Sequence, residues 1–196
     1  MPRARAGAAT LLLLAVGPLA GGCLLAPREA EPPGGSVIGY LPDSEPGAVL
    51  ANLDKALAGQ DASGYIQRLG PEFRYIPDSQ TLADYPATDW ENWDRAREEA
   101  FITSFLNSVD AVESSLTEVV LFDDWSGATA EWEMVYSLQV TSPGATQPTA
   151  YRGRAFFRLE IVDTFWRLVQ WRDVQGEADP VSGATLQTMG ALRGAF

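Results

Sequence analysis

The second half of the chain alternates between apolar and polar residues over four consecutive segments, and this pattern constrains the fold more than any other feature. The expected strands span residues 113–122, 128–141, 149–162 and 165–174. Turn-forming residues separate them at 123–127, 142–144 and 163–164. A period of two places every second side chain on the same face of a strand. Four such segments predict an antiparallel sheet with one covered face and one face in water.

The alternation also predicts which side chains face the core. One face of the second and third segments is apolar, and its expected inward residues include Trp132, Tyr136, Phe157 and Leu159. The other face carries charged residues on both segments: Arg152, Arg154 and Arg158 opposite Glu131 and Glu133. We interpret these charges as cross-strand ion pairs rather than an anion site, each worth about 0–1 kcal/mol.

Helical spacing predicts two helices at the start of the folded region. The first begins near Ser44, which can cap it, and ends at Gly59. The second begins at Asp61 and is stopped by Gly70 and Pro71. Both have apolar residues three and four positions apart, as expected where one helix face packs against a sheet.

A third helix is predicted after a short extended piece at residues 73–76. Thr88 and Glu91 have the spacing of a capping box, and the helix behind them runs to about Asn107. Its expected buried stripe consists of Trp90, Trp93, Arg97, Ala100, Phe101 and Phe105. We interpret this stripe as core rather than as a cofactor site. The predicted class is α+β, with N-terminal helices packed on a strongly curved antiparallel sheet.

Composition removes several kinds of chemistry. The chain has no histidine, which excludes histidine-based catalysis and histidine-ligated metals. Its single cysteine, Cys23, excludes an intramolecular disulfide. A net charge of −12 argues against nucleic acid as a partner. The adjacent Asp123 and Asp124 lack the spaced ligands of a calcium loop, so we expect neither a metal nor another cofactor.

The N-terminus has the three parts of a secretory signal peptide. Arg3 and Arg5 precede an uninterrupted apolar stretch at residues 8–16, and small residues follow it up to Cys23. The run Leu19-Ala20-Gly21-Gly22-Cys23 resembles the lipobox of bacterial lipoproteins, although alanine stands where leucine is usual. An uncleaved signal anchor over residues 6–26 and an ordinary buried thiol at Cys23 are the alternatives.

The lipoprotein resemblance implies a division of the chain and a location. Residues 1–22 would be the signal peptide, and residues 23–45 would be a lipidated cysteine followed by a flexible tether rich in proline. Leu24 follows the cysteine, which in that family favours the outer membrane and its periplasmic face. The expected partner is therefore the membrane, reached through a lipid on Cys23.

The element order and two motifs resemble the nuclear transport factor 2-like, or ketosteroid-isomerase-like, superfamily. The last strand carries Trp166, Leu168 or Val169, Trp171 and Asp173 in the spacing seen in bacterial lipoproteins of that fold. The tail at residues 189–194 is similar to an ending found there, with Met189 and Arg193 as departures. The resemblance implies a cystatin-like α+β cone over residues 46–196, with a pocket between sheet and helices. Such domains commonly dimerise through the sheet, and the sequence leaves the oligomeric state open.

Two classes of function remain. The resemblance implies a non-catalytic cone that binds a small apolar ligand or an envelope protein, or a pocket enzyme of the isomerase or hydrolase type. The candidate pocket residues are Tyr75, Trp132, Tyr136, Phe157 and Trp171, and the alternative is that these aromatic side chains fill the core. Asp173 is the candidate catalytic acid or base because it shares the parity of Trp171, and a rim aspartate is the alternative.

Overall fold

The computed structural model describes residues 38–196, and the predicted signal peptide and Cys23 lie outside this range. The helices are α1 (Pro46–Ala58), α2 (Ala62–Gln67), α3 (Ser79–Asp84), α4 (Arg95–Ser108) and α5 (Met189–Ala195). The strands are β1 (Leu69–Ile76), β2 (Ala111–Ser126), β3 (Thr129–Thr141), β4 (Thr149–Val162) and β5 (Phe165–Gly176). The α+β class predicted from the sequence is confirmed.

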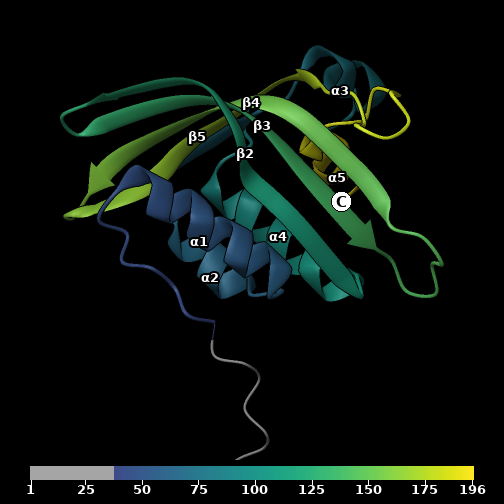
Figure 1. Ribbon diagram of the computed structural model, residues 1–196, viewed down its shortest axis with the longest axis horizontal. Coiled ribbons are helices and arrows are strands. Elements are labelled where there is room, and N and C mark those ends of the chain that lie inside the picture. Colours follow the sequence, from purple (N-terminus) through teal and green to yellow (C-terminus); the bar gives the residue numbers. More distant parts are fainter. Residues whose placement is uncertain (1–37) are drawn as a thin grey trace, which may run out of the picture. The chain divides into compact units, whose positions relative to one another are not determined.

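The five strands form one curved sheet in the order β1-β5-β4-β3-β2 (Figure 1). The four long strands pair antiparallel with their neighbours, as predicted. The short strand β1 instead pairs in parallel with β5, so the sheet is mixed. Helices α1, α2 and α4 lie against one face of the sheet, and α5 lies beside β4 at the other end (Figure 1).

The first two predicted helices are present with shifted boundaries. Helix α1 is preceded by Glu45 rather than Ser44, and that position makes no side-chain cap. Asp61 caps α2 as predicted, because its carboxylate accepts a hydrogen bond from the Gly64 amide. Pro71 was wrongly expected to end this helix, since it lies within β1. An edge strand tolerates proline because one of its sides has no ladder partner.

The third predicted helix begins later than its apparent capping box. Asp94, not Thr88, caps α4 by accepting a hydrogen bond from the Arg97 amide. The Tyr75 amide donates to the Trp93 carbonyl, which holds the chain ahead of α4 beside β1. Trp90 and Trp93 are therefore buried without being helical. The short helices α3 and α5 were not predicted from the sequence.

The predicted facing of the sheet residues is confirmed. Tyr136, Phe157 and Leu159 are fully buried, and Trp132 is partly buried against the same core. On the outer face, Arg154 pairs with Glu133 across the strands at 3.7 Å and with Glu177 at 2.8 Å. Arg158 pairs with Glu160 on its own strand at 2.8 Å. The predicted cross-strand ion pair is thus confirmed for Arg154. For Arg158 the prediction is wrong, because its carboxylate partner is Glu160 rather than Glu131 or Glu133.

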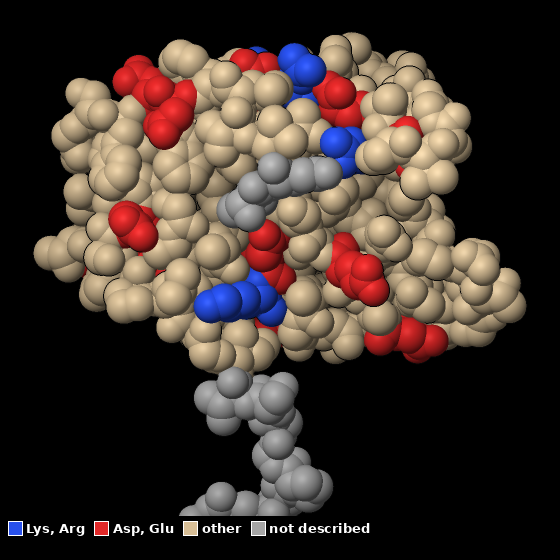
Figure 2. Space-filling model, in the orientation of Figure 1, with Lys and Arg blue, Asp and Glu red and all other residues tan. Residues whose placement is uncertain are grey.

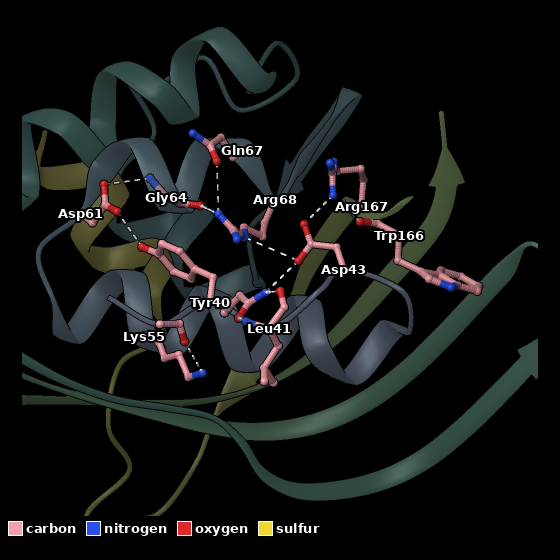
Figure 3. A network of polar contacts seen from close by, with 12 residues as sticks. Tyr40, Leu41, Asp43, Lys55, Asp61, Gly64, Gln67, Arg68, Trp166 and Arg167 are labelled. Carbon is pink, nitrogen blue, oxygen red and sulfur yellow. Dashed lines mark hydrogen bonds and ion pairs between the residues drawn. The ribbon is translucent and has the colours of Figure 1, made fainter. Parts of the chain in front are cut away.

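Residues 38–45, the end of the predicted tether, are fastened to the domain (Figure 3). The Asp43 carboxylate accepts a hydrogen bond from Arg167 at 2.6 Å and one from Asn52 at 2.7 Å. It also lies 3.6 Å from the Arg68 guanidinium. We call Asp43, Asn52, Arg68 and Arg167 the N-terminal clamp. Because it joins this segment to α1, the end of α2 and β5, the folded unit begins at Ile38.

Candidate functional site

Asp173 is buried inside the cone and surrounded by hydrogen-bond donors. Its side chain points inward from β5, and the residue is 3% exposed. The Tyr75 hydroxyl donates to one carboxylate oxygen at 2.7 Å. The Tyr136 hydroxyl and the Trp171 indole N–H each donate to the other oxygen at 2.8 Å. The carboxylate therefore accepts hydrogen bonds from neutral donors on three strands and is almost completely shielded from bulk water.

The pairing of the strands explains why these side chains meet. Trp171 and Asp173 are two residues apart on β5 and so share the inner face. Tyr75 on β1 is the register partner of Trp171. On β4, Ala155 faces Asp173, and Gly153 faces Tyr136. A Cβ at Gly153 would lie 2.7 Å from the Tyr136 hydroxyl oxygen, so a residue without a side chain makes room for it.

Burial determines the protonation of this cluster. It raises the pKa of Asp173 above its usual value, and the charge of Arg193 and the three donated hydrogen bonds offset only part of that rise. Burial, and next the nearby Asp173 carboxylate, raise the pKa values of Tyr75 and Tyr136 well above normal. Both tyrosines therefore stay protonated and act as donors.

A second buried charge cluster lies next to Asp173. Arg193 on α5 donates two hydrogen bonds to Glu98 on α4, at 2.6 and 2.9 Å. Both side chains are 0% exposed. The Tyr65 hydroxyl and the Trp93 indole N–H also donate to Glu98, at 2.9 and 2.7 Å. Burial acts to lower the pKa of Arg193, but the charge and hydrogen bonds of Glu98, with smaller contributions from Tyr65 and Tyr75, together outweigh burial and raise that pKa, so the arginine stays charged.

Aromatic rings form the walls around this arginine. The guanidinium carbon of Arg193 lies 4.0 Å from the ring centre of Tyr75, 4.7 Å from Trp171 and 5.4 Å from Phe101. A cation over an aromatic face is attracted by the ring quadrupole, and more so where water is excluded. We call Glu98, Tyr75, Trp171 and Phe101 the Arg193 cage. It joins the C-terminal helix to the Asp173 cluster through the shared residues Tyr75 and Trp171.

The structure brings together most of the residues predicted for the site. The rings of Tyr136, Phe157 and Trp171 pack on one another, with ring centres of Phe157 and Trp171 4.8 Å apart. Tyr75 joins this group through its hydrogen bond to Asp173, and its ring contacts Trp90 and Trp93. Trp132 is the register partner of Phe157 and packs against the same core, but it is only partly buried, and its indole N–H donates to Asp123 at 2.6 Å. In the described part of the chain, the predicted pocket aromatics other than Trp132 are thus part of a packed core.

The sequence reasoning missed the Arg193 cage. The predicted buried stripe of the third helix is wrong at Arg97 and Ala100, which are exposed, and Glu98, beside Arg97, is buried instead. Arg193 was noted only as a departure from the similar tail. One sequence feature points to it: the tail from Met189 to Phe196 is apolar or glycine apart from this arginine. Within residues 38–196, no three acidic or cysteine side chains are arranged to hold a metal ion.

Comparison with known proteins identifies the fold. No family model and no curated protein matches the chain. A "putative scytalone dehydratase" from Novosphingobium aromaticivorans superposes with a TM-score of 0.55 and 8% identity, over 72% of this chain and 89% of that one. A conserved protein from Planctomyces limnophilus gives 0.53 and 12% identity, over 64% and 89%.

A nuclear transport factor 2-like superfamily protein from Salmonella enterica gives a TM-score of 0.48 and 15% identity, over 69% of this chain and 92% of that one. At identities this low, structural likeness shows the fold and not the activity. The domain shares the fold of the Novosphingobium and Planctomyces proteins, an α+β cone of the kind that the resemblance to nuclear transport factor 2-like proteins implies.

Proposed function

We propose that this chain is a non-catalytic binding module of the bacterial cell envelope, because the interior of its α+β cone is filled by buried side chains. The observation that carries this proposal is the packing around Asp173. Both of its oxygens accept hydrogen bonds, and the aromatic side chains beside it are buried. A substrate would have to displace these neighbours to reach the carboxylate. A ligand or partner protein would therefore bind on the outer surface or at a site that opens.

The outer surface supports a protein partner. The edge strand β2 has a ladder neighbour on one side only, and Val120, Leu121, Phe122 and Trp125 on it are each about half exposed. An apolar run on a free edge is typical of a strand that meets another polypeptide. Asp123 and Asp124 interrupt the run, so the partner that fits is an envelope protein with an apolar segment and basic residues beside it.

The proposed location rests on the N-terminal sequence. A diacylglyceryl group and an N-acyl chain on Cys23 would hold the protein to the periplasmic face of the outer membrane. A chain of the length of residues 23–37 spans at most about 54 Å when fully extended, which would keep the domain near the membrane. Acidic side chains are scattered over the face in Figure 2, with few basic ones, so anionic lipid would not attract this face. Residues 38–196 contain no helix with the length and apolarity that crossing a bilayer requires.

The anchor can be tested by mass spectrometry of the mature native protein. We expect an acylated N-terminal cysteine at position 23. Replacing Cys23→Ser should prevent acylation and either release the chain from membranes or leave the precursor uncleaved. A mature chain that begins elsewhere and is soluble would overturn the anchor.

The closed interior can be tested by hydrogen exchange of indole N–H groups, measured by NMR on the full chain. Trp171 is fully buried and donates to Asp173, so its indole proton should exchange only when the domain unfolds globally. Trp125 is 52% exposed and serves as the control in the same spectrum. Exchange of Trp171 at a rate close to that of Trp125 would show an open interior and would overturn the non-catalytic proposal.

An enzyme is the second candidate, and one observation favours it. Burial raises the pKa of Asp173, and two neutral tyrosines donate to its carboxylate. Such a group can act as a general acid or base without histidine or metal. One solved neighbour is named for a dehydratase activity, which supports this candidate by analogy of fold alone. A surface hollow lined by Tyr75, Leu82 and Trp90 would be the route of entry.

A further inference from the structure

Three polar side chains form a row across β1, β5 and β4 on the outer face of the sheet. Gln170 on β5 is the register partner of Arg74 on β1 and of Arg158 on β4. Tyr75 and Trp171, which follow Arg74 and Gln170, are buried on the inner face, so the row points outward. Neighbouring strands lie about 5 Å apart. Two guanidinium groups and one carboxamide therefore lie close together in a chain whose net charge is −12.

Two members of this row have no partner for their side chains. Arg158 pairs with Glu160 at 2.8 Å. Within residues 38–196, the side chains of Arg74 and Gln170 make no hydrogen bond, ion pair or ring contact. A guanidinium presents several N–H groups to an anion, and the amide of a neighbouring glutamine can add another. Arg74 and Gln170 thus form a pair of donors that an external carboxylate can accept from.

An apolar hollow lies directly beside this pair of donors. Its volume is about 420 Å³, and the apolar side chains on its wall are Ile76, Pro77, Leu82 and Trp90. Sites for small molecules typically have about 300–1,000 Å³ and mostly apolar walls with few polar groups. Ile76 is 38% exposed and Leu82 is 47% exposed. A ligand that covers them would remove apolar surface from water, which favours binding.

The charges around the hollow favour an anionic head group at one place. Arg74 and Gln170 border this hollow and also a smaller one of about 220 Å³. Each acidic residue borders only one of the two: Glu91 the larger, and Glu72 and Glu160 the smaller. Glu160 already has an arginine partner on its own strand, and Glu72 and Glu91 are exposed and keep their hydration. The donors are therefore the polar groups that the two hollows share.

We propose that Arg74, Gln170 and the larger hollow form a binding site for a small amphipathic carboxylate. The carboxylate of the ligand accepts hydrogen bonds from Arg74 and Gln170, and its apolar body lies against Leu82 and Trp90. Tyr75 keeps its hydrogen bond to Asp173, so the ligand binds without opening the interior. The assignment rests on the proposed binding function, to which it adds a ligand class and a site at the sheet edge opposite β2.

An NMR titration of the full chain with sodium octanoate tests the site. The Trp90 indole N–H donates to the Tyr85 carbonyl at 3.0 Å and lies at the wall of the hollow, so its signal reports binding. We expect a saturable shift at Trp90 and none at Trp125, which lies on the opposite edge strand. Sodium chloride at equal ionic strength is the control for screening. No saturable shift at Trp90 below the concentration at which octanoate forms micelles overturns the proposal.

The charge of the probe shows whether the donors are used. n-Octylammonium has the same alkyl chain and the opposite charge, so it should bind about three to ten times more weakly than octanoate. Arg74→Gln should weaken octanoate by a similar factor and leave 1-octanol unchanged. Lys55→Gln removes one positive charge from α1, on the helix-covered side of the sheet, and is the matched control. Equal affinity for the two ions, or an unchanged octanoate affinity in Arg74→Gln, overturns the proposal.

A second pair of variants tests the apolar wall. Leu82→Asp places a charge in the hollow at a half-exposed position, so the fold should persist while octanoate and 1-octanol both bind more weakly. Val181→Asp introduces the same charge on a loop, where Val181 is 95% exposed, and should change neither affinity. Unchanged binding of both probes to Leu82→Asp overturns the proposal.

The same samples separate failure of this site from failure of the proposed function. Because the site lies outside the cone, octanoate should leave the Trp171 indole proton protected from exchange. Absence of octanoate binding with Trp171 still protected overturns the carboxylate site alone. Exchange of Trp171 as fast as that of Trp125 overturns the closed interior instead.

Discussion

The Arg193 cage and the N-terminal clamp fasten the two ends of the described chain, and each surrounds a buried arginine differently. In the cage, Arg193 and Glu98 are both 0% exposed and form two hydrogen bonds with each other. In the clamp, the Asp43 side chain is 10% exposed and is shared between Arg68, at 3.6 Å, and Arg167, at 2.6 Å. Arg167 is 22% exposed and so keeps part of its hydration.

The difference shows how distance from water changes what an ion pair requires. Without water, the cage needs two-point geometry, further donors to Glu98 and aromatic walls around the cation. Near the surface, the clamp relies on several donors from different elements and tolerates a longer contact to Arg68. One partner can therefore be removed from the clamp at moderate cost, because water replaces part of the loss, whereas the cage has no substitute.

The largest expected effect comes from breaking the cage at Glu98. Glu98→Ala leaves the Arg193 charge buried without its carboxylate, and we expect unfolding free energy to fall by about 3–5 kcal/mol. Urea denaturation of the full chain measures this. Glu99→Ala is the matched control, since it removes an exposed glutamate from the same helix and should change stability by less than about 0.5 kcal/mol.

The clamp should respond less strongly and more locally. Asp43→Ala removes the partner of Arg167 and Asn52, and we expect a loss of about 1–3 kcal/mol. Amide exchange should increase in residues 38–45 while α5 keeps its protection. Glu45→Ala, an exposed neighbour, is the control. A loss as large as that of Glu98→Ala would contradict the difference between the two regions.

The contribution of one aspartate to stability should change with pH in opposite directions beside the two regions: at Asp173, next to the Arg193 cage, and at Asp61, next to the N-terminal clamp. The pKa of Asp173 is raised by burial, so the folded state binds its proton more tightly than the unfolded state, and this contribution falls as pH rises above about 3.8. The slope is at most about 1.4 kcal/mol per pH unit for one proton. The stability of the wild type minus that of Asp173→Asn, measured across the acid range, gives this contribution.

Asp61, which fastens Tyr40 beside the clamp, is the comparison. The hydrogen bond from Tyr40 lowers the pKa of Asp61, so its contribution is present above pH 3.8 and is lost as pH falls through the lowered value. The difference between the wild type and Asp61→Asn should therefore have the reverse slope. Equal slopes for the two aspartates would contradict the assigned environments.

The smallest effect is expected for a pair exposed on the sheet. Arg158 and Glu160 lie 2.8 Å apart with side chains 47% and 37% exposed. Arg158→Gln should change stability by no more than about 0.5 kcal/mol, because water and salt already screen the pair. Urea denaturation at low and high salt measures it, and a cost above 1 kcal/mol would place this pair with the clamp.

Much of the sheet could be predicted because strand periodicity is local. The inward positions of Tyr136, Phe157 and Trp171 follow from alternation within single strands, and Asp173 follows from its spacing to Trp171. The start of α4 could not be found in this way. Thr88 and Asp94 are both acceptable caps, and the choice depends on a tertiary contact, the hydrogen bond from Tyr75 to Trp93.

The Arg193 cage could not be predicted either, because it depends entirely on contacts between residues that are far apart in the sequence. Glu98 and Arg193 are 95 positions apart in the sequence, and neither has a local pattern that marks it as buried. Because charged residues are mostly exposed, the sequence alone favours a solvent-exposed position for both Glu98 and Arg193. The parallel pairing of β1 with β5 could not be predicted either, because the alternation of residues within one strand does not indicate the direction of the neighbouring strand.

The N-terminal clamp has a mechanical consequence. Tension applied to the chain ahead of residue 38 first reaches Gly39, Tyr40 and Leu41, which are hydrogen-bonded to Lys55, Asp61 and Asn52. It then reaches Asp43, whose carbonyl also accepts a hydrogen bond from the Trp166 amide at 2.9 Å. Side chains from α1, the end of α2 and β5 meet at this one residue and carry the load in parallel. Helix α1 therefore lies behind the points of attachment, and pulling on the chain ahead of residue 38 would not unwind this helix from its end.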